Sequence, residues 1–378
     1  MLRARLTSVV AVLMAALTLG ACASGARSDF GLSEREASSP VGFPNVRFAI
    51  EDDQAARRIA SQLSQGVPKG PDGRFDLVAL SGGGANGAFA AGLMAGWTES
   101  GTRPDFEVVT GVSTGALAAP FVFLGPDWDD ELRRAYTDGE ASGLLKSRGL
   151  RAFFGSGVFS GAPLRALIDA HVDQRLLNAI AAEHAKGRTL LVATTDLDAQ
   201  RGVIWNMGAI AAKGGPEALD LFRQVLAASA SIPGVFPPVM IAAQGQGAVF
   251  EEMHVDGGVM NPFVALPQIM WSWDDPQGIL ADARIHVIVN GKDAPRFNVT
   301  RDAAPTVLGR ALDTVLGGQL RQSLAANRAF AERSGIQFRV AAIPEDYDGA
   351  DSLDFSQTSM QAVYDLGREL GRSGAAWK

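Results

Sequence analysis

Short apolar strands alternate with amphipathic helices along most of this chain. Phe75–Leu80 is an apolar strand, and a glycine-rich loop follows it. The next segment carries Phe89, Leu93 and Trp97 at i, i+4 and i+8, which is the spacing of a helical face. Residues 106–112 form a second strand that runs into another apolar helical stretch. This order predicts an α/β fold with a mainly parallel central sheet and helices on both faces.

Later stretches continue the alternation. Apolar spacing predicts helices at residues 51–65, 164–172, 221–230, about 311–333 and 357–375. Apolar and β-branched runs predict strands at residues 189–195, 284–290 and 338–343. Residues 254–258 are interpreted as a turn. Because no repeat or linker is visible after residue 45, we expect one domain over residues 46–378, with its motifs between about residues 75 and 265.

Composition narrows the function classes. The chain has 378 residues, of which 47% are hydrophobic and 20% charged, as in ordinary globular proteins. Its net charge of −7, with no Lys/Arg stripe, argues against a nucleic-acid partner. These quantities do not address the oligomeric state.

The N-terminus has the features of a targeting segment. Arg3 and Arg5 precede a short apolar run, residues 6–19, which is too short for a convincing membrane-spanning helix. The run ends at Cys22, in a Leu-Gly-Ala-Cys sequence that resembles the lipobox of bacterial lipoproteins. We therefore expect a signal peptide over residues 1–21, lipidation of Cys22 and a flexible tether over residues 22–45. An incidental cysteine at the end of a signal peptide is the alternative.

A lipidated Cys22 predicts where the protein is located, and the cysteine count predicts whether it has a disulfide. A lipidated cysteine would anchor the protein to a membrane of the bacterial cell envelope, and we expect the periplasmic side of the outer membrane. Cys22 is the only cysteine, so the mature fold has no internal disulfide.

The first candidate catalytic residue lies at the end of the second strand. Ser113 lies between Gly111 and Gly115 in a G-x-S-x-G sequence, between a strand and a helix. A nucleophile elbow has this pattern, since a sharp turn needs residues without a Cβ. A serine that only caps the following helix would look the same.

The earlier loop offers backbone amides. Gly82, Gly83, Gly84 and Gly87 turn several N–H groups towards one point, which could hold a phosphate or a developing oxyanion. They also satisfy the dinucleotide fingerprint, which requires an acidic residue at the end of the next strand. Glu107 has about the right separation but lies at the start of that strand. A phosphate- or nucleotide-binding module remains the alternative.

A serine nucleophile needs a base, and the four histidines suit that role poorly. His171 lies beside an apolar helical stripe, His184 in a polar helical stretch, and His286 within a strand. His254 precedes Asp256 by two positions. A Ser-His-Asp esterase remains an alternative. The sequence contains no H-E-x-x-H motif and no complete EF-hand, so we expect no metal and no organic cofactor.

Three motifs, taken together and in this order, resemble those of the patatin-like phospholipase family: the loop of residues 82–87, the elbow of residues 111–115, and Asp256-Gly257-Gly258. Residues 193–197, residues 228–238 and Asn261-Pro262 extend the resemblance. It covers residues 75–265 well and the C-terminal third only loosely.

The resemblance implies a patatin-like three-layer fold and a lipid acyl hydrolase that cleaves phospholipids or lysophospholipids. It implies that Ser113 is the nucleophile, that Asp256 is its base, and that the loop amides form the oxyanion hole. A carboxylate is a weak base at its ordinary pKa of about 4, so burial would have to raise the pKa of Asp256. Asn86 stands where the family commonly carries Arg or Lys, so a contact from this position to a lipid phosphate is not expected.

Overall fold

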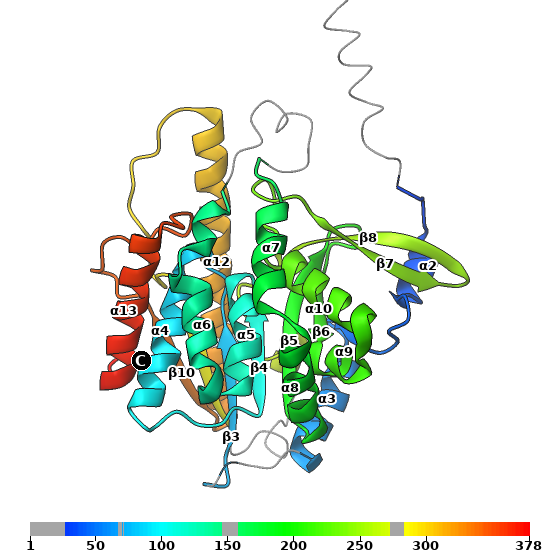
Figure 1. The fold of residues 1–378 in the computed structure, drawn as a ribbon, viewed down its shortest axis with the longest axis horizontal. Coiled ribbons are helices and arrows are strands. Elements are labelled where there is room, and N and C mark those ends of the chain that lie inside the picture. The colour runs from blue at the N-terminus through cyan, green and yellow to red at the C-terminus, as the bar shows by residue number, and fades with distance from the viewer. Residues whose placement is uncertain (1–26, 67–69, 71, 146–157, 273–282) are drawn as a thin grey trace, which may run out of the picture.

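A ten-stranded sheet forms the middle layer of the protein (Figure 1). The computed structural model describes residues 27–66, 70, 72–145, 158–272 and 283–378. The main strand order is β1-β7-β8-β5-β4-β3-β9-β10, and β6 joins β5 to β2. The strands are β1 (Ser39–Pro40), β2 (Arg47–Ala49), β3 (Phe75–Leu80), β4 (Val108–Val112), β5 (Thr189–Asp196), β6 (Arg201–Asn206), β7 (Val239–Gly245), β8 (Ala248–Asp256), β9 (Ala283–Val289) and β10 (Gln337–Ala342).

The centre of the sheet is parallel, as predicted. Strands β5, β4, β3, β9 and β10 are paired in parallel, in that spatial order. The other strands pair in antiparallel fashion and extend the sheet beyond β5. Because the carboxyl ends of parallel strands meet at one edge, the glycine loop after β3 and the elbow after β4 lie at the same edge.

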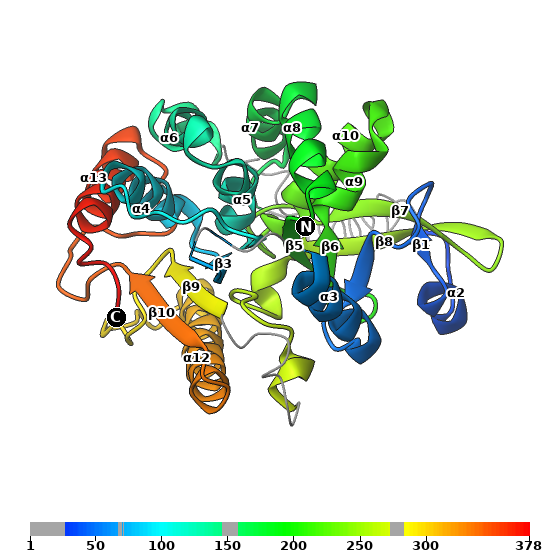
Figure 2. The same ribbon diagram turned by 90° about the horizontal axis from the view of Figure 1, so that it is seen from below.

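Helices cover both faces of the sheet, which confirms the three-layer α/β prediction (Figure 2). One face is covered by α4 (Gly87–Glu99), α5 (Thr114–Leu124), α6 (Asp129–Thr137), α7 (Ala162–His171), α8 (Gln174–Ala185), α9 (Met207–Lys213), α10 (Gly215–Ser229) and α13 (Gln357–Ser373). The other face is covered by α3 (Asp53–Gly66) and α12 (Ala304–Arg333). Among the described residues, no helix is both long and apolar enough to cross a membrane.

The C-terminal helix α13 packs closely on α4, the helix that begins at the glycine loop. A Cβ at Gly92 or Gly96 of α4 would overlap the α13 backbone at Tyr364 and Arg368. The absence of side chains at these two glycines lets the helices approach backbone to backbone. This contact makes the C-terminal third part of the same fold.

The described part of the predicted tether is folded, which corrects the expectation for residues 27–45. They include α2 (Leu32–Glu36), and β1 pairs with β7. Phe30 stacks on Phe250, and Phe43 is buried. Composition suggested a linker because the segment is rich in Gly, Ser and Pro, but its few aromatic side chains dock on the sheet extension.

A second correction concerns residues 254–258. His254 and Asp256 end the long strand β8, and only the Gly257–Val259 segment turns, as one short 3-10 helix. The β7–β8 hairpin was missed because its tight turn is Gln246-Gly247, not one of the common Asn-Gly or Asp-Gly pairs. Both turn residues have positive φ, 49° and 85°. The strand β6 was missed as well.

Candidate active site

Ser113 stands on a strained turn between β4 and α5. Its φ is 57° and its ψ is −126°, a conformation that a non-glycine residue rarely adopts. A Cβ at Gly111 would approach the Gly115 carbonyl oxygen to 2.5 Å, and one at Gly115 would overlap the Leu80 carbonyl. The predicted reason for both glycines is therefore confirmed: the turn brings backbone against backbone on both sides of the serine.

Strand pairing brings Asp256 to the end of the strand that carries Ser113. β6 occupies one side of β5 along residues 191–196, so β4 and β8 must share the other side. Val112 is the last β4 residue in that position, opposite Ala193. Asp256 of β8 follows opposite Thr194. Val112 and Asp256 thus occupy consecutive places beside β5, which brings Asp256 next to the turn at Ser113, although 143 positions separate Ser113 and Asp256 in sequence.

The end of α10 and the residues that follow it form hydrogen bonds to both Ser113 and Asp256. The Ser229 hydroxyl accepts a hydrogen bond from the Ser113 N–H at 3.0 Å and donates one to the Ala193 carbonyl at 2.7 Å. Two positions later, the Ser231 carbonyl accepts from the Asp256 N–H at 2.9 Å. Ser229 and Ser231 are buried. They lie in the 228–238 segment that the sequence analysis singled out, but no signal in the sequence identified their contacts.

Burial sets the protonation of Asp256. Because the carboxyl is enclosed, its pKa rises to about 7, and hydrogen bonds from the Ser113 hydroxyl and the Gly258 N–H limit the rise. The Gly258 N–H donates to Oδ1 at 2.7 Å. The other oxygen, Oδ2, is buried and accepts no hydrogen bond of normal geometry from the described residues. Asp256 therefore has one fixed oxygen and one oxygen free to take a proton near neutral pH.

The glycine loop divides into two parts. A Cβ at Gly83 would overlap the Asn290 carbonyl, and one at Gly84 would overlap the Ser352 carbonyl; φ is 158° and 57°. Within the described structure, the N–H groups of both residues donate no hydrogen bond. The Gly82 N–H, by contrast, donates to the Pro262 carbonyl at 3.1 Å. Gly83 and Gly84 thus have the amides that are free to bind a ligand.

The remaining motif glycines serve close packing. A Cβ at Gly82 would lie 3.2 Å from the Cβ of Ser113. One at Gly87 would overlap the Thr114 hydroxyl, and one at Gly257 the Ala193 carbonyl. A Cβ at Gly258 would lie 3.0 Å from Asp256 Oδ1. These glycines let the three motifs converge.

An apolar pocket begins beside the elbow and the glycine loop. Thr114 and Gly84 form part of its wall, and most of the remaining wall is aliphatic or aromatic. Its apolar lining includes Leu117, Phe121, Leu144, Leu167, Ile168 and Leu226. Such a lining suits a hydrocarbon chain better than a phosphate or a sugar.

All four histidines lie in the described structure, and each has a polar partner other than Ser113. His171 contacts Glu140 at 3.1 Å, and His184 contacts the Arg188 carbonyl at 3.2 Å. The partners of His254 are Thr194 and Glu252, at 3.0 and 3.3 Å, and His286 contacts Asp76 at 2.8 Å. This arrangement speaks against the Ser-His-Asp alternative.

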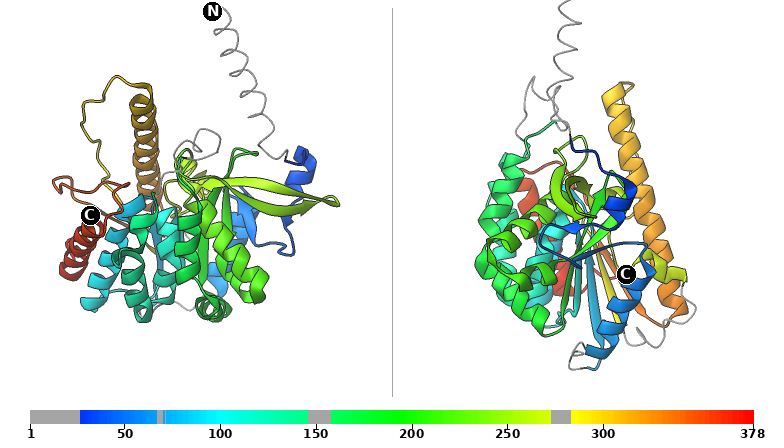
Figure 3. Two further views of the ribbon diagram at one scale, coloured as in Figure 1. Left: turned by 45° about the horizontal axis from the view of Figure 1, so that its top comes forward. Right: turned by 90° about the vertical axis from the view of Figure 1, so that its right-hand side faces the viewer.

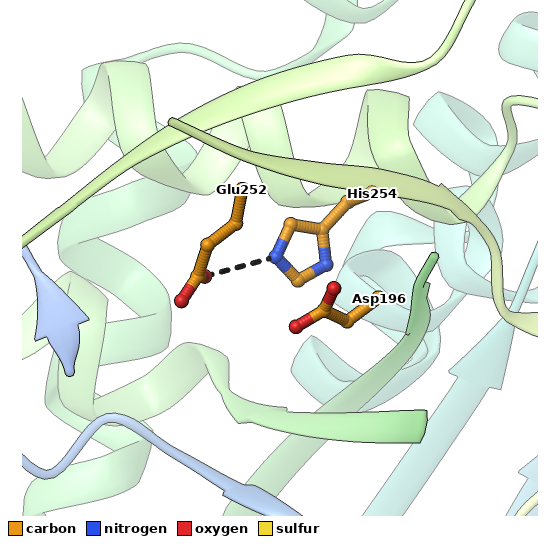
Figure 4. A group of neighbouring side chains, drawn as sticks. All are labelled: Asp196, Glu252 and His254. Carbon is orange, nitrogen blue, oxygen red and sulfur yellow. Dashed lines mark hydrogen bonds and ion pairs between the residues drawn. The ribbon is translucent and has the colours of Figure 1, made fainter. Parts of the chain in front are cut away.

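Asp196, Glu252 and His254 form a buried cluster whose ligand atoms lie within 4.8 Å of one another (Figure 4). Arginines already occupy both carboxylates. Arg35 pairs with Asp196 at 2.7 Å, and Arg47 pairs with both oxygens of Glu252. Arg47 and His254 hold the pKa of Glu252 well below its usual range, against the effect of burial. The residues therefore fit a charge-paired network that joins residues 35–47 to β5 and β8, not a metal site.

Glu107, the acidic residue considered for a nucleotide site, lies far from the glycine loop. Glu107 is buried before β4, where its carboxylate accepts from the Asp76 N–H at 2.5 Å. That is the amino end of the parallel strands, opposite the glycine loop. Asn86 is buried at the start of α4, and its N–H donates to the Gly83 carbonyl at 3.1 Å. Cys22 lies outside the described residues.

Comparisons with known proteins identify a family for this chain. The sequence model described as patatin-like phospholipase matches residues 78–267, which include the glycine loop, the elbow and the Asp-Gly-Gly motif. No curated protein matches the chain. Among solved structures, the crystal structure of VipD from Legionella pneumophila is 13% identical to this chain, covers 83% of it and 70% of its own chain, and has a TM-score of 0.37. The match of residues 78–267 shows that this chain belongs to the patatin-like phospholipase family, which is a family of lipid acyl hydrolases.

Proposed function

We propose that the protein is a membrane-anchored serine acyl hydrolase that cleaves ester bonds of phospholipids or lysophospholipids with a Ser113–Asp256 dyad. The observation that carries the proposal is the state of Asp256. Its pKa is raised to about 7 by burial beside the Ser113 hydroxyl, and its Oδ2 accepts no hydrogen bond of normal geometry from the described residues. A general base works best when its pKa lies near the working pH.

In the first half of the reaction, Ser113 Oγ attacks the ester carbonyl and its proton passes to Asp256 Oδ2. The negative charge that develops on the carbonyl oxygen is stabilised by the N–H groups of Gly83 and Gly84. The tetrahedral intermediate then collapses. The C–O bond to the leaving alcohol breaks, Asp256 returns the proton to that alcohol, and an acyl group remains on Ser113.

Water completes the cycle. Asp256 takes a proton from the water as its oxygen attacks the acyl carbonyl, and the same amides stabilise the second oxyanion. The Ser113 Oγ leaves with the proton held by Asp256, and the free fatty acid is released. Each turnover consumes one ester and one water and restores the starting protonation, so the scheme needs no metal or organic cofactor.

The apolar pocket supports a lipid substrate. Gly84 and Thr114, next to the proposed point of attack, are part of its lining, so an acyl chain bound there would bring its ester to Ser113. The pocket has a volume of about 50 Å³, so we propose that it widens when an acyl chain enters. The Asn86 side chain supplies no cation for the headgroup, and we propose that acyl-chain binding contributes most of the recognition. Lipidation of Cys22 would hold the enzyme at a membrane of the bacterial envelope, with the periplasmic side of the outer membrane as the proposed location.

The test is release of fatty acid from vesicles of phosphatidylethanolamine and phosphatidylglycerol, and from lysophospholipid micelles. We expect Ser113→Ala and Asp256→Ala each to reduce the rate by roughly a thousandfold or more. The exposed-site variants Ser142→Ala and Asp130→Ala are controls and should retain the wild-type rate. A wild-type rate in either dyad variant would refute the mechanism, and a wild-type protein that cleaves none of these lipids would refute the substrate class.

A further inference from the structure

Large apolar side chains are concentrated on one exposed segment, which we call the projecting segment: residues 291–318. It contains the loop after β9 and the first half of α12. Phe297 is 94% exposed, Val299 78%, Leu308 73% and Val315 57%. Val307 and Leu312 are also exposed. Such a grouping on a protein surface marks an interaction site more often than isolated apolar residues do.

The projecting segment rises from the edge that holds the candidate active site. It begins after Asn290, whose side chain donates to the Ser81 carbonyl at 2.8 Å and whose carbonyl lies against Gly83. It ends before Gln319, which contacts the Val259 carbonyl at 3.4 Å, close to Asp256. The part of α12 between these points is about 22 Å long, and its first turns rise above the neighbouring helices (Figures 1 and 3).

The two halves of α12 place their apolar residues on opposite sides. In the second half, Leu324 and Ala331 are seven positions apart and pack on the core. In the first half, Leu308 and Val315 are also seven positions apart. Val315 and Leu324 are nine positions apart, about two and a half helical turns, so they point in opposite directions. The apolar stripe of the first half is therefore directed away from the core.

We propose that the projecting segment inserts its apolar side chains into the surface of a lipid bilayer that contains anionic lipids. This inference rests on the proposed function, in which the substrate lies in a membrane. Between residues 296 and 315 the chain carries three arginines and two aspartates, whereas the whole chain has a net charge of −7. The segment thus lacks the negative charge that an anionic surface would repel.

The position of the N-terminal residues also supports a bilayer as the binding partner of the projecting segment. The described chain begins before α2, at the same end of the molecule as the start of α12 (Figures 1 and 3). Cys22, the proposed lipidation site, precedes the first described residue, Arg27, by five positions. An anchor at Cys22 and a bilayer at the projecting segment can therefore act on one membrane while the catalytic edge faces it.

The first experiment measures whether the segment enters lipid. In the full chain with Cys22→Ala and Ser113→Ala, Leu308→Cys supplies the single thiol for an environment-sensitive dye. We expect a blue shift with phosphatidylglycerol/phosphatidylethanolamine vesicles and quenching by spin labels on the acyl chains. The same dye at Asp130→Cys, on α6, should show neither change. No change in the dye at position 308 would overturn the proposal. A blue shift that increases with protein concentration in the absence of vesicles would also overturn it, because it would show that the segment binds a second copy of the protein.

The second experiment separates docking from chemistry. We expect the full chain with Leu308→Glu and Val315→Glu to lose about tenfold or more of its activity on vesicle phospholipid, because charges replace apolar contacts. Its activity on a water-soluble p-nitrophenyl ester should be unchanged. Val249→Glu, at a site of similar exposure, 66%, is the matched control. An unchanged vesicle rate in the double variant would contradict the docking, whereas a wild-type protein inactive on both substrates would instead contradict the proposed function.

Discussion

Replacing Asp256 with asparagine should stabilise the fold and abolish the activity. The carboxyl has a pKa of about 7 in the folded protein, against about 4 in an unfolded chain, so burial opposes its ionised form. Below about pH 4 the group is neutral in both states and costs nothing. As pH rises to 7 and above, only the unfolded chain ionises without penalty, and three pKa units at 1.36 kcal/mol each give a cost of about 4 kcal/mol.

Asparagine keeps the shape and cannot ionise. We therefore expect Asp256→Asn to raise the free energy of unfolding by about 4 kcal/mol at pH 8 and by less than about 1 kcal/mol at pH 4. Urea unfolding at both pH values measures this difference. Glu107, whose pKa is also raised to about 7 by burial, adds the same pH dependence to both proteins and cancels in the comparison.

Asp130→Asn, at an exposed site, should change neither value. An Asp256→Asn protein that is equally stable relative to wild type at pH 4 and pH 8 would refute the reasoning, because it would mean that burial does not raise this pKa. Loss of stability at pH 8 would also refute it.

Three further variants test other parts of the site. Ser229→Ala removes both hydrogen bonds of that hydroxyl, so we expect about 1–3 kcal/mol less stability in thermal unfolding and a lower kcat with little change in KM; unchanged kcat would exclude a positioning role. Gly83→Ala places a Cβ against Asn290 and should lower ester hydrolysis by roughly a hundredfold, while a wild-type rate would argue against an oxyanion site there. Leu167→Trp should fill the apolar pocket and shift the preference among p-nitrophenyl esters to shorter acyl chains; an unchanged chain-length profile would assign the acyl chain to another surface.

The local parts of the fold were predictable from the sequence because their signals are local. The strand before Ser113 was predicted from a β-branched run, the turn from two glycines, and the helix from the run of mostly small apolar residues that follows. The helices α4 and α13 follow from apolar spacing. Likewise, the glycine loop could be placed at the same edge as the elbow because both follow parallel strands.

The long-range contacts could not be predicted. The position of Asp256 depends on β8 taking the place beside β5 that β4 leaves, and no pattern within β8 records that partner. The contacts of Ser229 depend on a hydroxyl meeting an amide 116 positions away. The docking of residues 35–47 depends on buried carboxylates that Arg35 and Arg47 approach from far away in the chain. Such pairings belong to the assembled fold and leave no periodic trace in the sequence.

Labelling with a fluorophosphonate, followed by peptide mass spectrometry, tests the central claim most directly. The account predicts one adduct, on the peptide that contains Ser113, formed at a rate that rises with pH and levels off above about pH 7 as Asp256 ionises. In the folded Asp256→Asn protein the same labelling should be slower by roughly a thousandfold. An adduct on another residue, no adduct, or equally fast labelling of the Asp256→Asn protein would contradict the Ser113–Asp256 dyad.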